Sequence, residues 1–208
     1  MRIYFCYINI TFYILILVCI LFPIIFSGCA VIAPFTVAGT GAALSDERSI
    51  GMQVDDKVIL ARIKNAQAES KIPGIWSNIE ILVVEGRVLM VGCLEKEDYV
   101  DEANRISWSI KGVKEVINEI VIDEISFSQR AQDSFIANQI RAKMLVEKDF
   151  LSSNYSVSVF KNTAYLIGLS QNKQESNKAI LLTKEINGVN KIVNHIILRD
   201  DPRRWYRV

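Results

Sequence analysis

The stretch Val88-Leu89-Met90-Val91-Gly92 returns downstream as Ala164-Tyr165-Leu166-Ile167-Gly168. The pair Gly112-Val113 likewise returns as Gly188-Val189, and every matched position lies 76 residues from its partner. A repeat of this length is a whole small domain, because solenoid units repeat every 20 to 50 residues or so. The sequence of 208 residues is therefore predicted to contain two copies of one module.

Each copy has the hydrophobic spacing of a helix, a strand hairpin, a second helix and a third strand. In the first copy we expect a helix over 56–68 capped by Asp55 or Asp56, strands over 79–83 and 87–92, a helix from Glu95 to Gly112, and a strand over 113–122. In the second copy the matching elements are expected at 134–145, 155–159, 164–168, 174–186 and 189–198.

The long link between the second and third strands allows a right-handed crossover beside the hairpin. The prediction is an α+β fold, in which each module has a small three-stranded mixed sheet with two helices on one face. Five glycines are expected to be structural. Gly86 forms the hairpin turn, Gly92 and Gly168 end a strand packed closely on a helix, and Gly112 and Gly188 end a helix in a left-handed conformation.

The N-terminal segment is strongly apolar. No charged residue occurs from Ile3 to Ser45, and an apolar stretch over 8–26 follows the single positive charge of Arg2. About 20 apolar residues suffice to span a bilayer, so a retained N-terminal anchor is one interpretation. An export signal that is cleaved off is the other.

Charge differs sharply between the two copies. Residues 55–124 contain nine Lys and Arg against fourteen Asp and Glu, a net charge of −5, whereas residues 125–198 contain nine against five, a net charge of +4. A cationic surface near an anionic leaflet gains about 1 kcal/mol per Lys or Arg. We therefore expect the second module to contact anionic lipid, with ordinary solvated charge as the alternative.

Two groups of residues in the second half are candidates for that contact. If Ile136 faces the core, Phe135 is turned about 100° away, either to insert among headgroups or to pack at the edge of the core. The C-terminal tail combines basic and aromatic residues, as at a membrane interface, although a disordered tail is the alternative. The lipid-binding candidates are Phe135, Arg141, Lys143, Arg203, Arg204 and Trp205.

Signs of catalysis are absent from the sequence. His195 is the only histidine and is expected to be a strand residue that faces solvent or the module edge. Cys93 is expected to be a small, partly buried hydrophobic residue, and one His with one spare Cys cannot supply the ligands of a zinc site. No P-loop, GxSxG or dinucleotide motif occurs. We predict a protein that is not an enzyme and binds no metal or cofactor.

The element order and glycine spacing resemble the BON domain, and the stretch over 46–56 resembles the segment that precedes the first such domain. Phe26-Ser27-Gly28-Cys29 resembles a bacterial lipobox. Together these features resemble the outer-membrane lipoproteins that contain two BON domains. The resemblance implies a signal peptide over 1–28, lipidation of Cys29, a tether over 29–54, domains over 55–124 and 125–198, and a basic aromatic tail over 199–208.

Membership of such a family implies a location as well as a function. Ala30 follows the cysteine where retention in the inner membrane calls for Asp, so we expect a lipid anchor in the outer membrane that faces the periplasm. The implied function is binding of anionic phospholipid surfaces and support of outer-membrane integrity. Export makes nucleic acid an improbable partner. The alternative function is a periplasmic protein-interaction or chaperone-like module that recruits an envelope partner.

Overall fold

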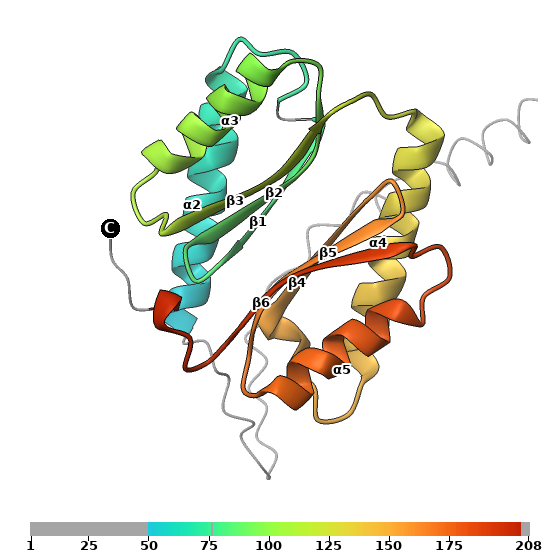
Figure 1. Ribbon diagram of the computed structural model, residues 1–208. Helices are drawn as coiled ribbons and strands as arrows, with labels where there is room; N and C mark the ends of the chain where they lie inside the picture. Colours follow the sequence, from blue (N-terminus) through green and yellow to red (C-terminus); the bar gives the residue numbers. More distant parts are fainter. Residues whose placement is uncertain (1–49, 76, 205–208) are drawn as a thin grey trace, which may run out of the picture. The chain divides into compact units, whose positions relative to one another are not determined.

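Two three-stranded sheets, one from each copy of the repeat, form the framework of the computed structural model, which describes residues 50–75 and 77–204 (Figure 1). In each sheet the hairpin strands are antiparallel and the third strand lies parallel to the second. The predicted mixed sheets are therefore confirmed. The first sheet contains β1 (Ile79–Val84), β2 (Arg87–Leu94) and β3 (Glu115–Ile122), and the second contains β4 (Tyr155–Phe160), β5 (Thr163–Ser170) and β6 (Lys191–Leu198).

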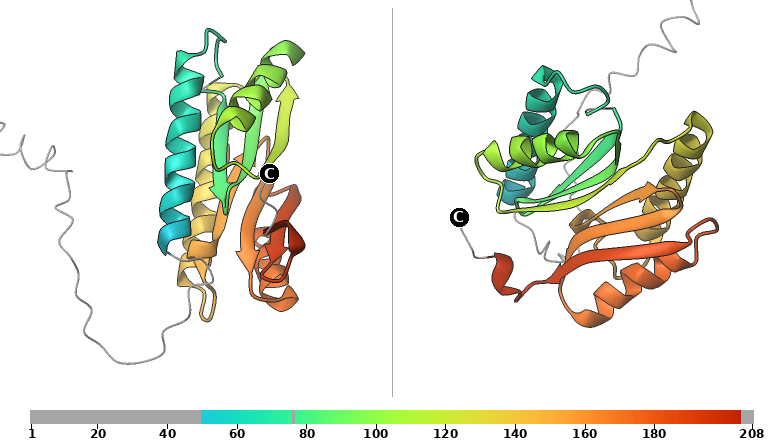
Figure 2. Two further views of the ribbon diagram at one scale, coloured as in Figure 1. Left: turned by 90° about the vertical axis from the view of Figure 1, so that its left-hand side faces the viewer. Right: turned by 45° about the horizontal axis from the view of Figure 1, so that its top comes forward.

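Two helices cover one face of each sheet (Figure 2). They are α2 (Ile50–Glu69) and α3 (Glu97–Ser109) in the first module, and α4 (Phe127–Val146) and α5 (Lys173–Lys184) in the second. Short 3₁₀ turns η1 (Ser152–Asn154) and η2 (Pro202–Arg204) precede β4 and follow β6. Each helical layer closes a separate apolar core against its sheet. Of the helices in the described part of the chain, none is both long and apolar enough to cross a membrane.

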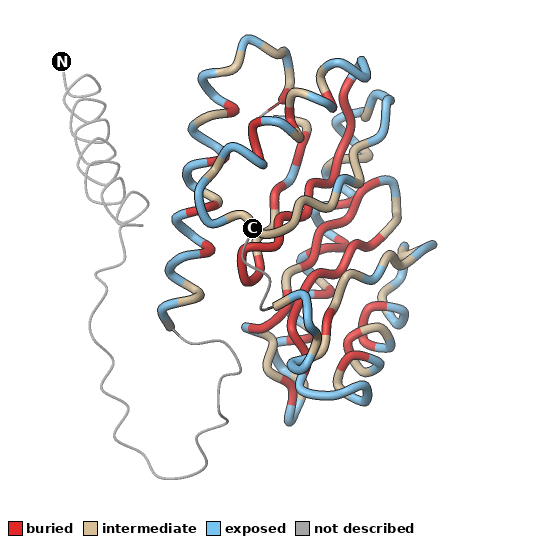
Figure 3. Tube along the Cα trace, turned by 60° about the vertical axis from the view of Figure 1, so that its left-hand side comes forward, coloured by how far each residue is buried: buried red, intermediate tan, exposed pale blue. Residues whose placement is uncertain are grey.

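The opposite faces of the two sheets pack against each other. Along β2, Val88 and Met90 point into the helix-covered core, whereas Leu89 and Val91 point toward the second sheet. Side chains alternate between the faces of a strand, so β2 is buried along its whole length (Figure 3). A third apolar core thus joins the modules. Its buried members are Val84, Leu89, Val91, Cys93, Phe160, Tyr165 and Ile167.

Polar contacts also cross this interface, and one of them joins equivalent positions of the two repeats. Glu119 and His195 are separated by 76 residues, and His195 Nε2 lies 3.0 Å from Glu119 Oε1. The buried Arg87 donates from Nη1 to the His195 carbonyl at 2.9 Å and bonds Glu115 at 2.5 Å. The expectation that His195 faces solvent or a module edge was therefore wrong, because the stacked sheets place it at the module interface.

Both first helices begin earlier than expected. Within the described residues α2 starts at Ile50 and not at 56, so it includes the end of the expected tether. α4 starts at Phe127 and not at 134, because the Ser126 side chain caps it by accepting from the Gln129 amide at 3.2 Å. The expected signal peptide over 1–28, the lipidated Cys29, most of the tether, and Trp205 lie outside the described residues.

An aspartate inside each first helix holds the hairpin turn of its own module. Asp56 is buried, and its two carboxylate oxygens accept from the backbone amides of Glu85 and Gly86, both at 2.8 Å. Asp133 does the same for the amides of Lys161 and Asn162, at 2.8 and 3.0 Å. Asp56 is therefore a turn anchor and not the helix cap that the sequence suggested.

The repeated glycines stand where the chain passes close to other atoms. A Cβ at Gly92, which has a φ of +148°, would lie 2.0 Å from the Asn78 carbonyl oxygen, so the close contact of Gly92 is with the entry to β1 and not with a helix. β2 also continues past Gly92 to Leu94. Gly112 has a φ of +102°, and a Cβ there would lie 3.1 Å from Ile59 Cδ1 of α2. Both glycines therefore have a positive φ, and Gly112 is the one of the two that approaches a helix.

Candidate functional site

Phe135 lies on the solvent side of α4 with 65% of its surface exposed, so its ring does not pack at the edge of the core. The core side of this helix consists of Asp133, Ile136, Ala137, Ile140 and Met144. Successive residues are turned by about 100° in a helix, which puts Phe135 on the side that no other element of residues 50–75 and 77–204 covers.

Phe135 belongs to an exposed, uncharged stripe that runs the length of α4. Its members recur at spacings of three and four residues, as expected for one face of a helix. Phe127, Leu145 and Val146 expose 87%, 73% and 79% of their surfaces. We call this stripe the α4 outer face, and it consists of Phe127, Ala131, Phe135, Asn138, Ala142, Leu145 and Val146. An exposed apolar patch of this kind marks a binding surface for a membrane or a protein.

Cations border the α4 outer face on both sides. Arg141 bonds Glu80 of the first module at 3.1 Å and the Val157 carbonyl at 2.5 Å. Lys143 borders the other side of the face, where it pairs with Glu185 of the second module. Arg130 lies on the same side as Arg141. The arrangement is an apolar stripe between basic residues, as in helices that lie at a membrane surface.

The two tail candidates that the structure describes, Arg203 and Arg204, are engaged within the protein. Arg203 bonds Asp201 through Nη2 at 2.7 Å, and this hydrogen bond lowers the pKa of the Asp201 carboxyl to about 2. Arg204 pairs with Glu85 of the first module, and its side chain is 8% exposed. The structure therefore places the two tail arginines away from the α4 outer face and gives them intramolecular partners.

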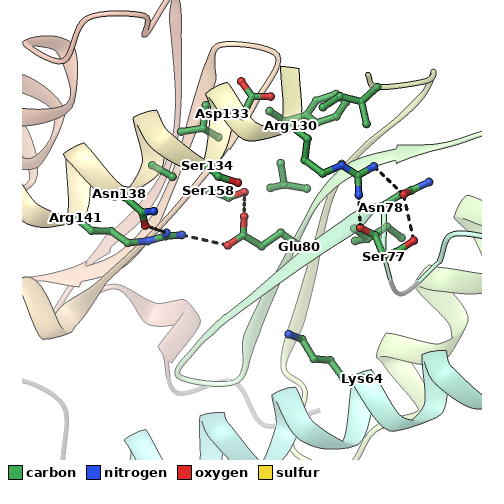
Figure 4. A pocket seen from close by; sticks show the side chains of 17 residues that line it. Lys64, Ser77, Asn78, Glu80, Arg130, Asp133, Ser134, Asn138, Arg141 and Ser158 are labelled. Atoms are coloured by element: carbon green, nitrogen blue, oxygen red, sulfur yellow. Dashed lines mark hydrogen bonds and ion pairs between the residues drawn. The ribbon is translucent and has the colours of Figure 1, made fainter. Parts of the chain in front are cut away.

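A groove with a volume of about 370 Å³ opens beside the α4 outer face, where the two modules meet (Figure 4). One wall is α4 with part of β4, and the other wall comes from β1, from the loop before it and from Lys64 of α2. Ser158 donates to Glu80 across the groove at 2.6 Å. Sequence reasoning missed this groove because residues from two separate modules form it.

Sequence reasoning also missed Phe127, Leu145 and Val146 as members of the exposed face. A detectable signal was present, because an uncharged residue recurs every three or four positions outside the core stripe. The helix predicted over 134–145 was too short to include Phe127 and Val146, so the stripe was not apparent.

Comparison with known proteins identifies the repeated unit. The family described as BON domain matches the chain twice, over residues 55–124 and 132–200. The chain is 35% identical over 153 residues to an Anaplasma centrale protein called "Uncharacterized protein in gshII 5'region", covering 73% of this chain and 99% of that protein.

Two further relatives are similar over most of their length. The chain is 30% identical over 173 residues to "Outer membrane lipoprotein DolP" of Haemophilus influenzae, covering 82% of this chain and 88% of that protein. It is 28% identical over 157 residues to the "21 kDa hemolysin" of Actinobacillus pleuropneumoniae, covering 73% of this chain and 78% of that protein. With its duplicated helix, hairpin, helix and strand and two matches to one domain family, the chain belongs to the BON domain family.

Proposed function

We propose that this protein is a non-enzymatic envelope lipoprotein that binds anionic phospholipid surfaces through its second module and supports outer-membrane integrity. The observation that supports this proposal is the α4 outer face. Its four large apolar side chains are exposed and uncovered, and basic residues border the stripe on both sides. Burial of one Phe side chain is worth about 1.5 to 3 kcal/mol, and each nearby cation adds about 1 kcal/mol on an anionic leaflet.

A lipid anchor at Cys29 fits this weak surface affinity. A protein held at a membrane by acyl chains has a high effective concentration there, so modest headgroup contacts suffice for occupancy. The similarity to an outer-membrane lipoprotein supports a location on the periplasmic side of the outer membrane. In cells, labelling with palmitate should be lost in Cys29→Ser. Label that persists in this variant would refute the lipoprotein assignment.

Vesicle binding by residues 43–208 tests the lipid contact directly. This fragment is one compact unit that contains all three apolar cores, so it is suitable as a soluble protein. We expect stronger binding to phosphatidylcholine vesicles that contain phosphatidylglycerol than to phosphatidylcholine alone. Phe135→Glu should weaken binding by about tenfold or more, because it replaces an inserting ring by an anion.

Leu181→Glu is the matched control for Phe135→Glu. Leu181 is 58% exposed on α5 of the same module, so the substitution makes the same change of charge and polarity away from α4. It should bind within about threefold of the unchanged protein, since only the general charge of the module changes. Equal effects of the two substitutions, or no preference for anionic vesicles, would refute the proposal.

A protein-interaction surface on the first module is the second candidate. Trp108 of α3 is 50% exposed, and Glu97 and Asp101 lie on the same side of that helix. An exposed indole among carboxylates suits a basic protein partner. A photocrosslinking residue at position 108 should then capture one envelope protein in cells, whereas the same residue at position 181 should not.

A further inference from the structure

The groove between the modules adjoins the α4 outer face. Ser134, Asn138 and Arg141 line it, and Asn138 also belongs to the outer face. Phe135 follows Ser134 directly, so a residue of the apolar outer face and a residue of the groove wall are neighbours on α4. A lipid whose acyl region touches Phe135 therefore has its headgroup within reach of the groove.

Two cations line the groove without an acidic partner among residues 50–75 and 77–204. Within the described residues, neither Lys64 nor Arg130 forms an ion pair. Arg130 donates to two neutral acceptors, the Ser77 carbonyl at 2.8 Å and Asn78 Oδ1 at 2.9 Å (Figure 4). A guanidinium carries five N–H donors, so Arg130 retains donors for a ligand.

The two carboxylates that line the groove are already engaged. Glu80 accepts from Arg141 and from Ser158. Asp133 accepts from the amides of the β4–β5 turn through both oxygens. The unpaired positive charge of Lys64 and Arg130 therefore favours an anion, and arginine is well suited to phosphate oxygens.

Neutral polar groups complete the groove. Ser134 is exposed and offers a hydroxyl, and Asn138 accepts from Arg141 through Oδ1, which leaves its amide hydrogens free to donate. Such groups match the hydroxyls of a glycerol unit. The volume of about 370 Å³ falls in the range of small-molecule sites, roughly 300 to 1,000 Å³.

We propose that this groove binds the phosphoglycerol headgroup of an anionic phospholipid, with Lys64 and Arg130 on the phosphate and Ser134 and Asn138 on the glycerol hydroxyls. The inference rests on the proposed function, since the α4 outer face brings the lipid to the groove. It adds that the first module takes part in lipid binding, through Lys64.

Charge substitutions inside and outside the groove test this proposal with residues 43–208 and phosphatidylglycerol-containing vesicles. Lys64→Glu and Ser134→Asp should each weaken binding by about tenfold, because an anion replaces a phosphate-binding group or is placed beside one. Arg62→Glu is the control, since Arg62 is exposed on the same helix and does not line the groove. It should bind within about threefold of the unchanged protein.

The outcomes separate the groove from the outer face. If Lys64→Glu matches Arg62→Glu while Phe135→Glu loses binding, the headgroup site is wrong and the proposed function stands. If Phe135→Glu binds as well as the unchanged protein, both proposals fall. Thermal unfolding of each variant checks that a loss of binding is not a loss of fold.

A soluble probe distinguishes a headgroup from a free phosphate ester. Glycerol 1-phosphate should shift the amide NMR signals of Ser134 and Asn138 in the unchanged protein, and not in Lys64→Glu. Inorganic phosphate should shift them less, because it lacks the glycerol hydroxyls. Glycerol 1-phosphate could shift these signals while the groove substitutions leave vesicle binding unchanged. That result would assign the groove to a soluble phosphate ester and overturn the headgroup proposal.

Discussion

The guanidinium of Arg204 donates two hydrogen bonds to the carboxylate of Glu85, from Nε to Oε2 at 2.7 Å and from Nη2 to Oε1 at 2.8 Å. The two side chains are 8% and 2% exposed. Arg204 ends η2 after the second module, and Glu85 forms the first hairpin turn, where its φ is +55°. Lys114 adds a bond to the Arg204 carbonyl at 3.2 Å. The tail thus fastens one module to the other.

Loss of the Arg204 side chain should destabilise the protein strongly. Arg204→Ala leaves the Glu85 carboxylate buried without its partner, and such a change costs about 3 kcal/mol. Urea denaturation of residues 43–208 measures the free energy of unfolding. Arg203→Ala is the control, because Arg203 is 53% exposed, so solvent screens its pair with Asp201 and its loss should cost clearly less than the loss of Arg204. Equal losses of the free energy of unfolding in Arg204→Ala and Arg203→Ala would contradict the assignment of a buried tail contact.

The aspartates that anchor the hairpin turns should be required for stability in both modules. Asp56→Asn removes the negative charge and one of two acceptors of buried amides, at a cost of about 1.5 to 3 kcal/mol. Asp133→Asn should have a similar effect. Asp55→Asn makes the same change at an exposed neighbour and should alter the free energy of unfolding by less than about 0.5 kcal/mol. A comparable loss for Asp55→Asn would argue against the anchors.

The repeated strand glycines should tolerate alanine unequally. Gly92→Ala puts a Cβ 2.0 Å from a backbone oxygen at a φ of +148°, which costs at least about 3 kcal/mol. A Cβ at Gly168 would lie 2.6 Å from Tyr155 Cδ1 and 2.9 Å from the Asn154 carbonyl oxygen, which are less severe contacts, and they occur without the positive φ of Gly92. Gly168→Ala should therefore unfold at a higher temperature than Gly92→Ala, and the reverse order would be inconsistent with the packing described.

The Asp201–Arg203 pair should make stability depend on pH in the acid range. Hydrogen bonds from Arg203 lower the pKa of Asp201 to about 2, below its ordinary value of about 3.9. Because the folded pKa is the lower one, the stability from this group is fully present above pH ~4 and is lost as the pH falls toward about 2. Carbon NMR titration of Asp201 checks the pKa, and a midpoint near 3.9 would exclude the effect. The stability difference from Asp201→Asn should disappear below about pH 2.

Much of the fold was predictable because local signals repeat. The apolar runs that end at Gly92 and Gly168, and the paired Gly112 and Gly188, locate the same strands and helix ends twice. Repetition separates a real boundary from a chance pattern, so the two mixed sheets and the BON domain were predicted correctly. The continuous apolar run of β2 fits a strand that is buried on both faces, but cover was predicted on one face only. What covers the second face depends on a partner sheet far along the chain.

The candidate site was less predictable because its parts depend on tertiary contacts. The position of Phe135 beside Ile136 on a helix indicated that its ring turns away from the core, but left exposure and packing at the core edge as alternatives. No local pattern indicates that Arg204 reaches Glu85 across 119 residues, or that Arg130 lies against Asn78. Asp56 was read as a cap because a capping residue and a turn anchor are the same residue type. In each case the partner lies outside the sequence window on which the interpretation depended.

The core between the two sheets makes the association of the modules an intramolecular event. Two separate chains that met through Leu89, Val91 and Ile167 would dissociate on dilution. Here the connecting chain holds the two sheet faces near each other, so their effective concentration does not depend on the concentration of the protein. The pairing of Glu119 with His195, its counterpart in the repeat, is an intrachain version of a twofold contact between subunits. A protein built this way keeps both halves of its interdomain groove together at any concentration.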